Sequence, residues 1–155
     1  MHDLTYTRLL REDDPDIPRL LAVYRLPEVA RCIHLSDRYF HYVAHSEGVY
    51  FYKVYAGDSL AGAIHLETQG DTLFMDILVF PGHQRKGLGT QIVRDVQRDV
   101  FALGYGRIEV AIDESNAASL RLFEGAGFVR TAQEDELITL GWPSGACAPA
   151  ADMLK

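Results

Sequence analysis

The sequence contains little cysteine: Cys32 and Cys147 lie far apart and form no Cys-x-x-Cys pair. This scarcity argues against a disulfide-stabilised domain and favours two reduced thiols. Long apolar runs are also absent. No stretch of 18 residues is apolar enough to span a membrane, and residues 1–4 do not resemble a secretory start. We therefore expect a cytoplasmic protein that has no membrane partner.

Basic residues are scarce relative to acidic ones, with 15 Lys and Arg against 22 Asp and Glu and a net charge of −7. A nucleic-acid partner requires a broad basic surface, so this balance argues against nucleic acid as the main partner. It suits a small cationic or amine acceptor, although only as a weak preference.

The length of 155 residues corresponds to one domain with a substantial core, and no internal repeat is visible. We expect a single domain over residues 1–142. Residues 143–155 are small, polar and without periodicity, so we expect them to form a C-terminal tail.

Residues 73–104 carry the pattern around which the chain is organised. Residues 73–80 are apolar except for Asp76, and Pro81-Gly82 ends this run. Beyond a glycine-bearing turn, apolar side chains recur at helical spacing up to Gly104: Leu88, Ile92, Val96, Val100 and Leu103. This pattern predicts a buried strand, a tight loop and a helix that ends at Gly104.

The loop before this helix has the features of a phosphate-binding turn. The first N–H groups of a helix lack intrahelical partners, and the helix dipole makes that end positive. Cations are normally disfavoured there, yet Arg85 and Lys86 are present, while Gly87 and Gly89 allow close approach to the backbone. An ordinary strand–helix connection with solvated basic side chains is the alternative.

Two sequence blocks carry a resemblance to a known family. The first is Val79-Phe80-Pro81-Gly82-His83-Gln84-Arg85-Lys86-Gly87-Leu88-Gly89. The second is Asn116-x-x-Ser119-x-x-Leu122-Phe123-Glu124-x-x-Gly127-Phe128. In order and spacing they resemble the pyrophosphate-binding signature and the later Asn-x-x-Ala/Ser-x-x-Leu-Tyr block of the GNAT N-acetyltransferase superfamily. The resemblance covers roughly residues 4–140.

The resemblance implies a fold, a cofactor and its contacts. The implied fold is α/β (α+β): a mixed, mostly antiparallel twisted sheet of about six or seven strands, about four helices, and a splayed strand pair at the acyl-CoA site. The implied cofactor is acetyl-CoA or another acyl-CoA. The backbone of Ile77, Leu78 and Val79 would bind the pantetheine arm. The pyrophosphate would be held by Gln84, Arg85, Lys86, Gly87, Leu88, Gly89 and Thr90, with further cofactor contacts from Asn116, Ser119 and Phe123.

Phe123 is the main departure from the family pattern. Many relatives carry tyrosine there as a general acid for the leaving thiolate, and phenylalanine cannot donate a proton. A thiol with a pKa near 8.5 is a tolerable leaving group without help, so activity is not excluded. A purely structural role in packing the helix is the alternative for Phe123.

The remaining elements follow from periodicity and turn residues. We expect helices after Asp13-Asp14-Pro15, after Pro27 and after Ser36-Asp37, and another over residues 117–124. Strands are expected over residues 4–10, 49–56, 59–68, 107–112, 128–131 and 136–140. Gly70-Asp71 suits a two-residue hairpin turn, which would place His65 opposite Asp76.

The pair of His65 and Asp76 is the best candidate for acid–base chemistry. An amine acceptor must lose a proton before it attacks a thioester, and histidine changes charge near neutral pH. Asp76 is the single charge in its apolar run, so it needs a partner, and His65 is the nearest candidate. Glu67 on the same strand face is a second candidate base. A His–Asp pair with a purely structural role is the alternative.

His41 and His45 are four residues apart and could share a helix face, as paired metal ligands do. No third ligand has a recognisable spacing, so we expect polar surface there and no metal site.

The sequence therefore predicts an acyl-CoA-dependent N-acyltransferase that transfers acetyl to a primary amine of a small molecule or a protein. A CoA-binding sensor or interaction domain without transferase activity is the first alternative, and a nucleotide-phosphate binder is the second. Whether the chain forms a homodimer stays open.

Overall fold

A computed structural model of the chain describes residues 3–143 and contains one seven-stranded sheet with the strand order β1-β2-β3-β4-β5-β7-β6. The strands are β1 (Leu4–Arg8), β2 (Val49–Ala56), β3 (Ser59–Gln69), β4 (Thr72–Val79), β5 (Arg107–Asp113), β6 (Val129–Glu134) and β7 (Leu137–Trp142). The helices are α1 (Ile17–Tyr24), α2 (Pro27–Ala30), α3 (Tyr39–His45), α4 (Leu88–Gln97) and α5 (Ala117–Gly125).

This architecture agrees with the expected mixed sheet. All neighbouring strands pair antiparallel except β4 and β5, which are parallel. Five helices are described within residues 3–143, at the five places that periodicity and turn residues predicted, while the resemblance implied about four. The predicted tail lies, apart from Pro143, outside the described residues, as does Cys147. No helix within residues 3–143 is long and apolar enough to cross a membrane.

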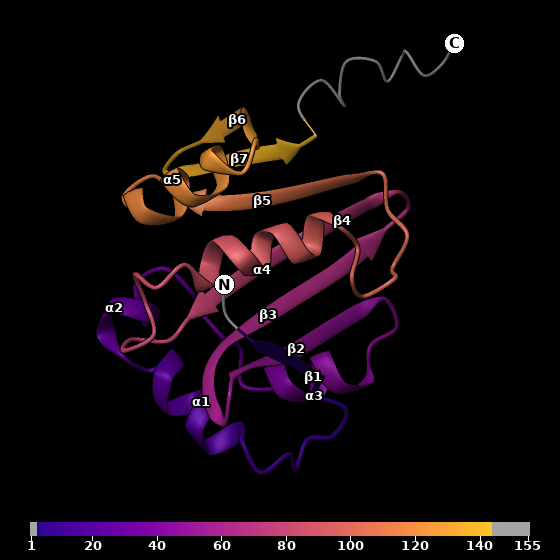
Figure 1. Ribbon diagram of the computed structural model, residues 1–155, viewed down its shortest axis with the longest axis vertical. Coiled ribbons are helices and arrows are strands. Elements are labelled where there is room, and N and C mark those ends of the chain that lie inside the picture. Colours follow the sequence, from indigo (N-terminus) through magenta and orange to yellow (C-terminus); the bar gives the residue numbers. More distant parts are fainter. Residues whose placement is uncertain (1–2, 144–155) are drawn as a thin grey trace.

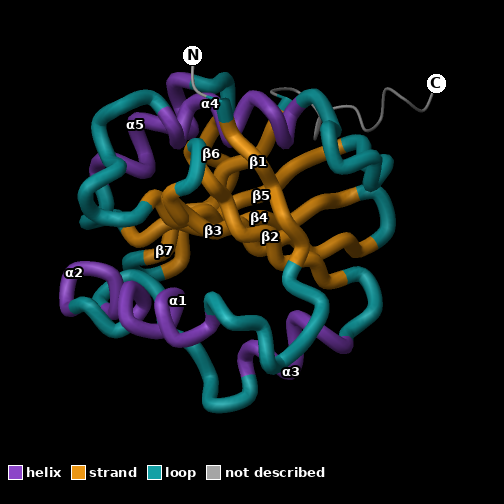
Figure 2. The backbone as a smooth tube through the Cα atoms, turned by 60° about the horizontal axis from the view of Figure 1, so that its bottom comes forward, coloured by secondary structure: helices purple, strands orange, loops and turns teal. Residues whose placement is uncertain are grey.

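The helices cover both faces of the sheet, and each face has its own core. Figure 2 shows α4 and α5 on one side and α1, α2 and α3 on the other. Ile92 and Val96 of α4 pack with Leu66 and Met75 on the first face. On the second face, α1 and α3 bury apolar side chains against Phe51, Ala63 and Phe80. The alternation along β3 and β4 therefore sends neighbouring residues to two different cores.

The β3–β4 register is the one predicted from the turn. Gly70 has a φ of +59°, Gln69 pairs with Thr72, and the Cα of His65 lies opposite that of Asp76. A β-bulge is present, but it interrupts the β2–β3 ladder at Val54/Tyr55 and so leaves the β3–β4 register intact.

Two predicted helix limits are wrong. The central helix α4 ends at Gln97 and not at Gly104, because Asp99 has a φ of 54° and its carboxylate accepts hydrogen bonds from the N–H groups of Leu103 and Gly104. Helix α1 begins at Ile17, later than the Asp13-Asp14-Pro15 sequence suggested. Asp14, which precedes α1, accepts a hydrogen bond from the Lys53 ammonium group at 2.8 Å.

Strands β4 and β5 pair only at one end, and this separation positions the site. Thr72, Leu73 and Phe74 pair with residues 107–109, and no later β4–β5 pair is present among the described residues. β4 nevertheless remains paired with β3 as far as Val79. Beyond Phe74, one edge of β4 is thus left facing a gap between two strands of the same sheet. Figure 1 shows α4 crossing over this region of the sheet.

Candidate cofactor cleft and acceptor site

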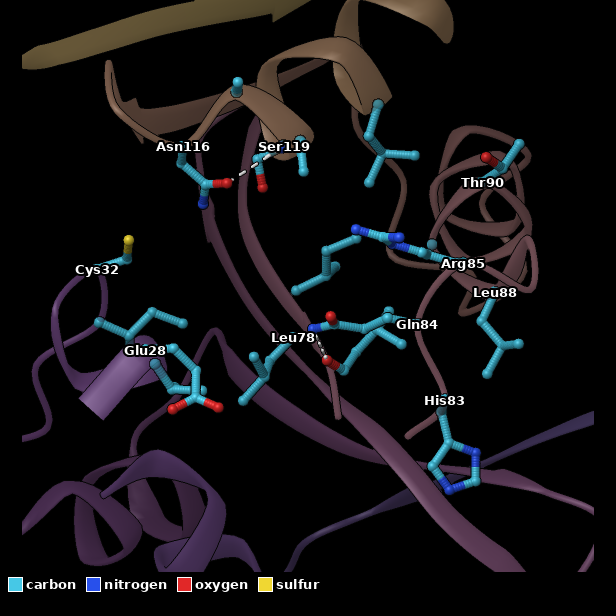
Figure 3. Close-up of a pocket in the computed structure, with 18 of the residues that line it drawn as sticks. Glu28, Cys32, Leu78, His83, Gln84, Arg85, Leu88, Thr90, Asn116 and Ser119 are labelled. Atoms are coloured by element: carbon cyan, nitrogen blue, oxygen red, sulfur yellow. Dashed lines mark hydrogen bonds between the residues drawn. The ribbon is translucent and has the colours of Figure 1, made fainter. Parts of the chain in front are cut away.

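A cleft of about 680 Å³ lies where the open edge of β4 meets the beginnings of α4 and α5. Three segments face one another across it in Figure 3: α2 with Glu28, the loop before α4 with Gln84 and Arg85, and the start of α5 with Asn116. The predicted cofactor residues that line it are Ile77, Leu78, Val79, Gln84, Arg85, Gly87, Leu88, Gly89, Thr90, Asn116 and Ser119.

The loop between β4 and α4 lines the cleft and has an unusual backbone conformation. Gly82, Arg85 and Gly87 all have positive φ values, of 95°, 64° and 83°. Such left-handed residues between right-handed ones form concave arrays of N–H groups that bind anions. Gly87 is the N-cap of α4 and makes no side-chain cap, so the first amides of the helix lack that partner. Arg85 is strained in this conformation, which is typical of a functional turn.

The open edge of β4 offers backbone groups of alternate residues. The N–H of Phe80 donates to the carbonyl of Ala61 at 2.8 Å, so Phe80 bonds toward β3. Because these groups alternate along a strand, those of Leu78 also point to β3, whereas those of Ile77 and Val79 point into the gap. The Gln84 side chain donates to the Val79 carbonyl at 2.9 Å, consistent with this direction.

Asn116 has a structural role as well as its place in the cleft. Its side-chain oxygen accepts a hydrogen bond from the N–H of Ser119 at 3.2 Å, which caps α5 (Figure 3). An Asn at this position therefore fixes where α5 begins, and α5 supplies one wall of the cleft.

Two of the predicted cofactor-binding residues, Lys86 and Phe123, are not among the residues that line the cleft. Lys86 is exposed and is not part of the cleft lining. Phe123 is only 3% exposed and packs in the core against Phe128, with ring centroids 5.1 Å apart. The neighbouring residue, Leu122, lines the cleft instead. The phenyl ring of Phe123 thus belongs to the core, and its expected position near the thiol end of the cofactor stays a prediction.

Sequence reasoning missed the wall formed by α2 and the residues after it. Glu28, Arg31, Cys32 and Ile33 line the cleft from this side, and the Cys32 thiol is free and exposed. No motif marks this segment. Its only sequence signal was Pro27, which predicts where the short helix begins but not what it faces.

His65 has two polar partners, and neither is Asp76. Its Nδ1 lies 2.6 Å from the Tyr39 hydroxyl, and its Nε2 lies 2.7 Å from Glu67 Oε2. A carboxylate only accepts, so Nε2 carries the proton that it donates to Glu67, and in the neutral imidazole Nδ1 then accepts from the Tyr39 hydroxyl. The Tyr42 hydroxyl also donates to Glu67, at 2.9 Å. The predicted register is confirmed, while the partners of His65 come from α3 and from its own strand.

The Asp76 side chain reaches solvent, although nearby protein atoms partly desolvate its carboxylate. Desolvation raises the pKa of this carboxyl group, the nearby His65 lowers it, and the charge of Glu67 raises it. Burial also raises the pKa of Tyr24 and of Tyr39, and the charge of Asp76 raises both further. Both hydroxyls therefore remain protonated at neutral pH.

A second cavity of about 590 Å³ adjoins this group of side chains. Tyr24, Tyr39 and Phe40 form its aromatic lining, and Ile33 lines both this cavity and the cleft. The two cavities therefore share a wall. The structure thus provides a cleft at a glycine-bearing turn and, beside it, a cavity lined by Tyr24 and Tyr39, the two tyrosines on which the charge of Asp76 acts.

A sequence profile of the Acetyltransferase (GNAT) family matches residues 10–128, which is most of the chain. The chain belongs to the GNAT acetyltransferase family. The resemblance drawn from the two motif blocks is confirmed, and so is the expected fold. Acetyl-CoA is the cofactor with which GNAT acetyltransferases work, in agreement with the predicted cofactor class.

The curated relative YvbK of Bacillus subtilis, described as an uncharacterized N-acetyltransferase, is 35% identical to this GNAT protein over 79 residues. The alignment covers 50% of this chain and 51% of YvbK, so it spans about half the length of that relative.

Two solved structures share the GNAT fold of this chain. A domain from Methanocaldococcus jannaschii has a TM-score of 0.76 at 16% identity and covers 91% of this chain and 98% of its own. The N-acetyltransferase PseH of Campylobacter jejuni, in complex with acetyl coenzyme A, has a TM-score of 0.73 at 11% identity, with 92% and 99% covered. At these identities the likeness concerns the fold.

Proposed function

We propose that this GNAT protein is an acetyl-CoA-dependent N-acetyltransferase that acts on a primary amine, and that the acceptor is a small molecule. The observation that carries the proposal is the pair of adjoining cavities, one at the glycine-bearing turn before α4 and one lined by Tyr24 and Tyr39. The charge of Asp76 acts on both of these tyrosines. The acceptor class rests on the size of the second cavity, which is typical of small-molecule sites. A cytoplasmic location and a homodimer stay predictions.

The residues of the cleft fit a nucleotide–pantetheine cofactor. The amides around Gly87, at the N-terminus of α4, would hold the pyrophosphate, and Arg85 would add positive charge. The backbone groups of Ile77 and Val79 would orient an extended pantetheine arm along β4. Bound acetyl-CoA supplies the activated acetyl thioester. PseH, which has a similar fold, holds acetyl coenzyme A.

Asp76 is the group that we assign to take the proton from the amine. Its carboxylate is open to solvent, and its raised pKa makes it a stronger base than an ordinary aspartate. His65 is less suited to this step, because Tyr39 and Glu67 occupy both of its ring nitrogens and its side chain is only 14% exposed. We assign His65 and Glu67 to positioning, with Glu67 as the second candidate base.

The amine itself would be held by the aromatic lining of the second cavity. A protonated amine is attracted to the faces of tyrosine and phenylalanine rings and to the Asp76 carboxylate. Loss of the proton to Asp76 then leaves a neutral nucleophile next to the shared wall at Ile33. Positioning of the two reactants would supply much of the rate.

Thermal stability with ligands tests the cofactor assignment. Acetyl-CoA and CoA at about a hundred times their Kd should each add about 2.7 kcal/mol, whereas ATP should add far less. Thiol release should then be followed with acetyl-CoA and a panel of primary amines. Stabilisation by acetyl-CoA without thiol release from any amine would favour the sensor alternative, which the buried Phe123 supports. Equal stabilisation by ATP and CoA would favour the nucleotide-phosphate alternative.

A pair of glycine variants separates cofactor binding from stability. Gly87→Ala and Gly57→Ala both place a side chain at a positive φ, of 83° and 63°, and should destabilise the fold by about 1 kcal/mol each. Only Gly87 lies in the cleft, so only Gly87→Ala should weaken acetyl-CoA binding, measured by calorimetry. Equal affinities for the two variants would refute the anion-binding turn.

A further inference from the structure

The exposed side of α3 contains a cluster of nitrogen and oxygen donors at the outer edge of the second cavity, to which no role in the transfer has been assigned. His41 Nδ1 and His45 Nε2 lie 2.8 Å and 2.9 Å from the same carboxylate oxygen, Oε2 of Glu12. Glu12 belongs to the loop between β1 and α1, 29 and 33 residues away along the chain. The sequence showed the two histidines but no third ligand, and folding brings Glu12 to them.

The donor set matches that of a divalent transition metal. The three donor atoms lie within 4.8 Å of one another, and the two imidazole rings are 4.7 Å apart. Zn²⁺ binds imidazole nitrogen and carboxylate oxygen at about 2.0–2.2 Å, so neighbouring ligand atoms of a tetrahedral site lie about 3.4 Å apart. The two N···O distances therefore need to open by about half an ångström.

The side chains are free to make this adjustment. His41, His45 and Glu12 are 43%, 51% and 50% exposed, and no packed core constrains them. Glu12 is an exposed glutamate, which is ionised at neutral pH, and both histidines already contact its Oε2. The adjacent Arg11 is paired with Asp13 at 2.8 Å and does not neutralise Glu12.

We propose that Glu12, His41 and His45 form a binding site for Zn²⁺ with three protein ligands and an open fourth position. In the metal-free form each imidazole donates a hydrogen to Glu12. On binding, each ring moves its proton to the other nitrogen, and the metal replaces both hydrogens. The two histidines are placed for this because residues i and i+4 share a helix face.

The site stands at the rim of the second cavity, since Glu12 and His41 also line it. Bound metal joins the β1–α1 loop to α3, the helix that carries Tyr39 and Tyr42 to His65 and Glu67. The metal site is separate from the transfer chemistry, and its existence does not depend on the proposed function.

Calorimetric titration of untagged, chelator-treated full-length protein with ZnCl₂ tests the site. We expect one Zn²⁺ per chain, together with a higher melting temperature. Glu12→Gln and His45→Ala should each weaken Zn²⁺ binding at least about tenfold. Mg²⁺ should cause no stabilisation, because it prefers an all-oxygen shell.

His34→Ala is the matched control, because His34 is exposed and lines the same cavity but lies outside the cluster. It should bind Zn²⁺ as the unaltered chain does. Absence of saturable Zn²⁺ binding would overturn the proposal. So would binding that survives in a His41→Ala/His45→Ala double variant whose melting temperature without metal shows that it is folded.

Discussion

Asp76 is the single ionisable residue of β4, and desolvation by its surroundings makes its charge costly. Because burial raises its pKa, the folded protein binds this proton more tightly than the unfolded chain does. The free energy of unfolding therefore falls as the pH rises from the ordinary aspartate pKa through the raised one. Above that interval the ionised carboxylate destabilises the fold, which is the expected cost of keeping a partly desolvated base.

Asp76→Asn should therefore raise the melting temperature at neutral pH and lower kcat by about a hundredfold or more, since the base is lost. The stability gain should vanish at pH values below the ordinary aspartate pKa, where the unaltered residue is already protonated. Melting curves at several pH values measure the change in stability. Initial rates with varied amine acceptor at saturating acetyl-CoA measure the change in kcat. Asp58→Asn, at an exposed turn between β2 and β3, is the control and should change neither. Unchanged kcat in Asp76→Asn would remove Asp76 from the mechanism.

Tyr39 and Tyr42 contact the same His65–Glu67 pair in different surroundings. Tyr39 is partly buried and contacts His65, whereas Tyr42 is 41% exposed and donates to Glu67. Tyr39→Phe leaves His65 Nδ1 without its donor, so we expect a loss of about 1 kcal/mol in urea unfolding and an altered pH profile of kcat/KM. Tyr42→Phe should lower the free energy of unfolding by less than Tyr39→Phe does and should leave the pH profile of kcat/KM unchanged. Identical pH profiles for the two variants would argue against a positioning role for Tyr39.

At the scale of elements, the separation of β4 from β5 gives the cleft its backbone donors. The alternation along β4 points Ile77 and Val79 into the gap and Leu78 toward β3. Acetyl-CoA should therefore slow amide hydrogen exchange at Ile77 and Val79 much more than at Leu78, whose amide is already bonded within the sheet. Residue-resolved exchange with and without acetyl-CoA measures this difference. Equal protection of all three amides would mean that the ligand does not bind along this edge.

The strands could be predicted because their signals are local. The residues of the Gly70-Asp71 turn set the β3–β4 register, and the structure has that register. The end of α4 could not be predicted in this way, since Val100 and Leu103 continue the helical spacing while the Asp99 side chain ends the helix. A pattern of apolar residues does not show that one carboxylate will bind the backbone ahead of it.

The site was predictable where a motif marks it and not elsewhere. The turn before α4 and the start of α5 carry motifs, and their residues line the cleft. The α2 wall carries none. The contacts of His65 with Tyr39 and of Glu12 with His41 join residues 26 and 29 positions apart, so they depend on how α3 packs against the sheet. The difference between Leu122 and Phe123 depends on the rotation of α5, which a match of spacing does not determine.

At the scale of the whole molecule, the protein carries a net charge of −7, whereas the charged residues that line the second cavity include both signs. The charged residues lining that cavity include Arg25 and Arg38 as well as Glu12 and Asp37, so the local charges nearly cancel. Attraction of a cationic amine therefore comes mainly from the overall field and from Asp76. Such long-range attraction is screened by salt, whose Debye length is about 30 Å at 0.01 M and about 8 Å at 0.15 M.

We therefore expect kcat/KM to fall with rising ionic strength, and to fall more steeply for a diamine than for a monoamine of similar length. Each additional positive charge on the acceptor increases the steering that salt removes, so the diamine should lose at least about twofold more between about 0.01 and 0.15 M salt. Initial rates at low acceptor concentration and saturating acetyl-CoA measure this ratio. A neutral acceptor analogue that carries no charge at the assay pH is the control and should respond little. Equal salt dependence for the diamine and the monoamine would mean that the acidic surface does not steer the acceptor, and that recognition resides in the aromatic cavity and Asp76 alone.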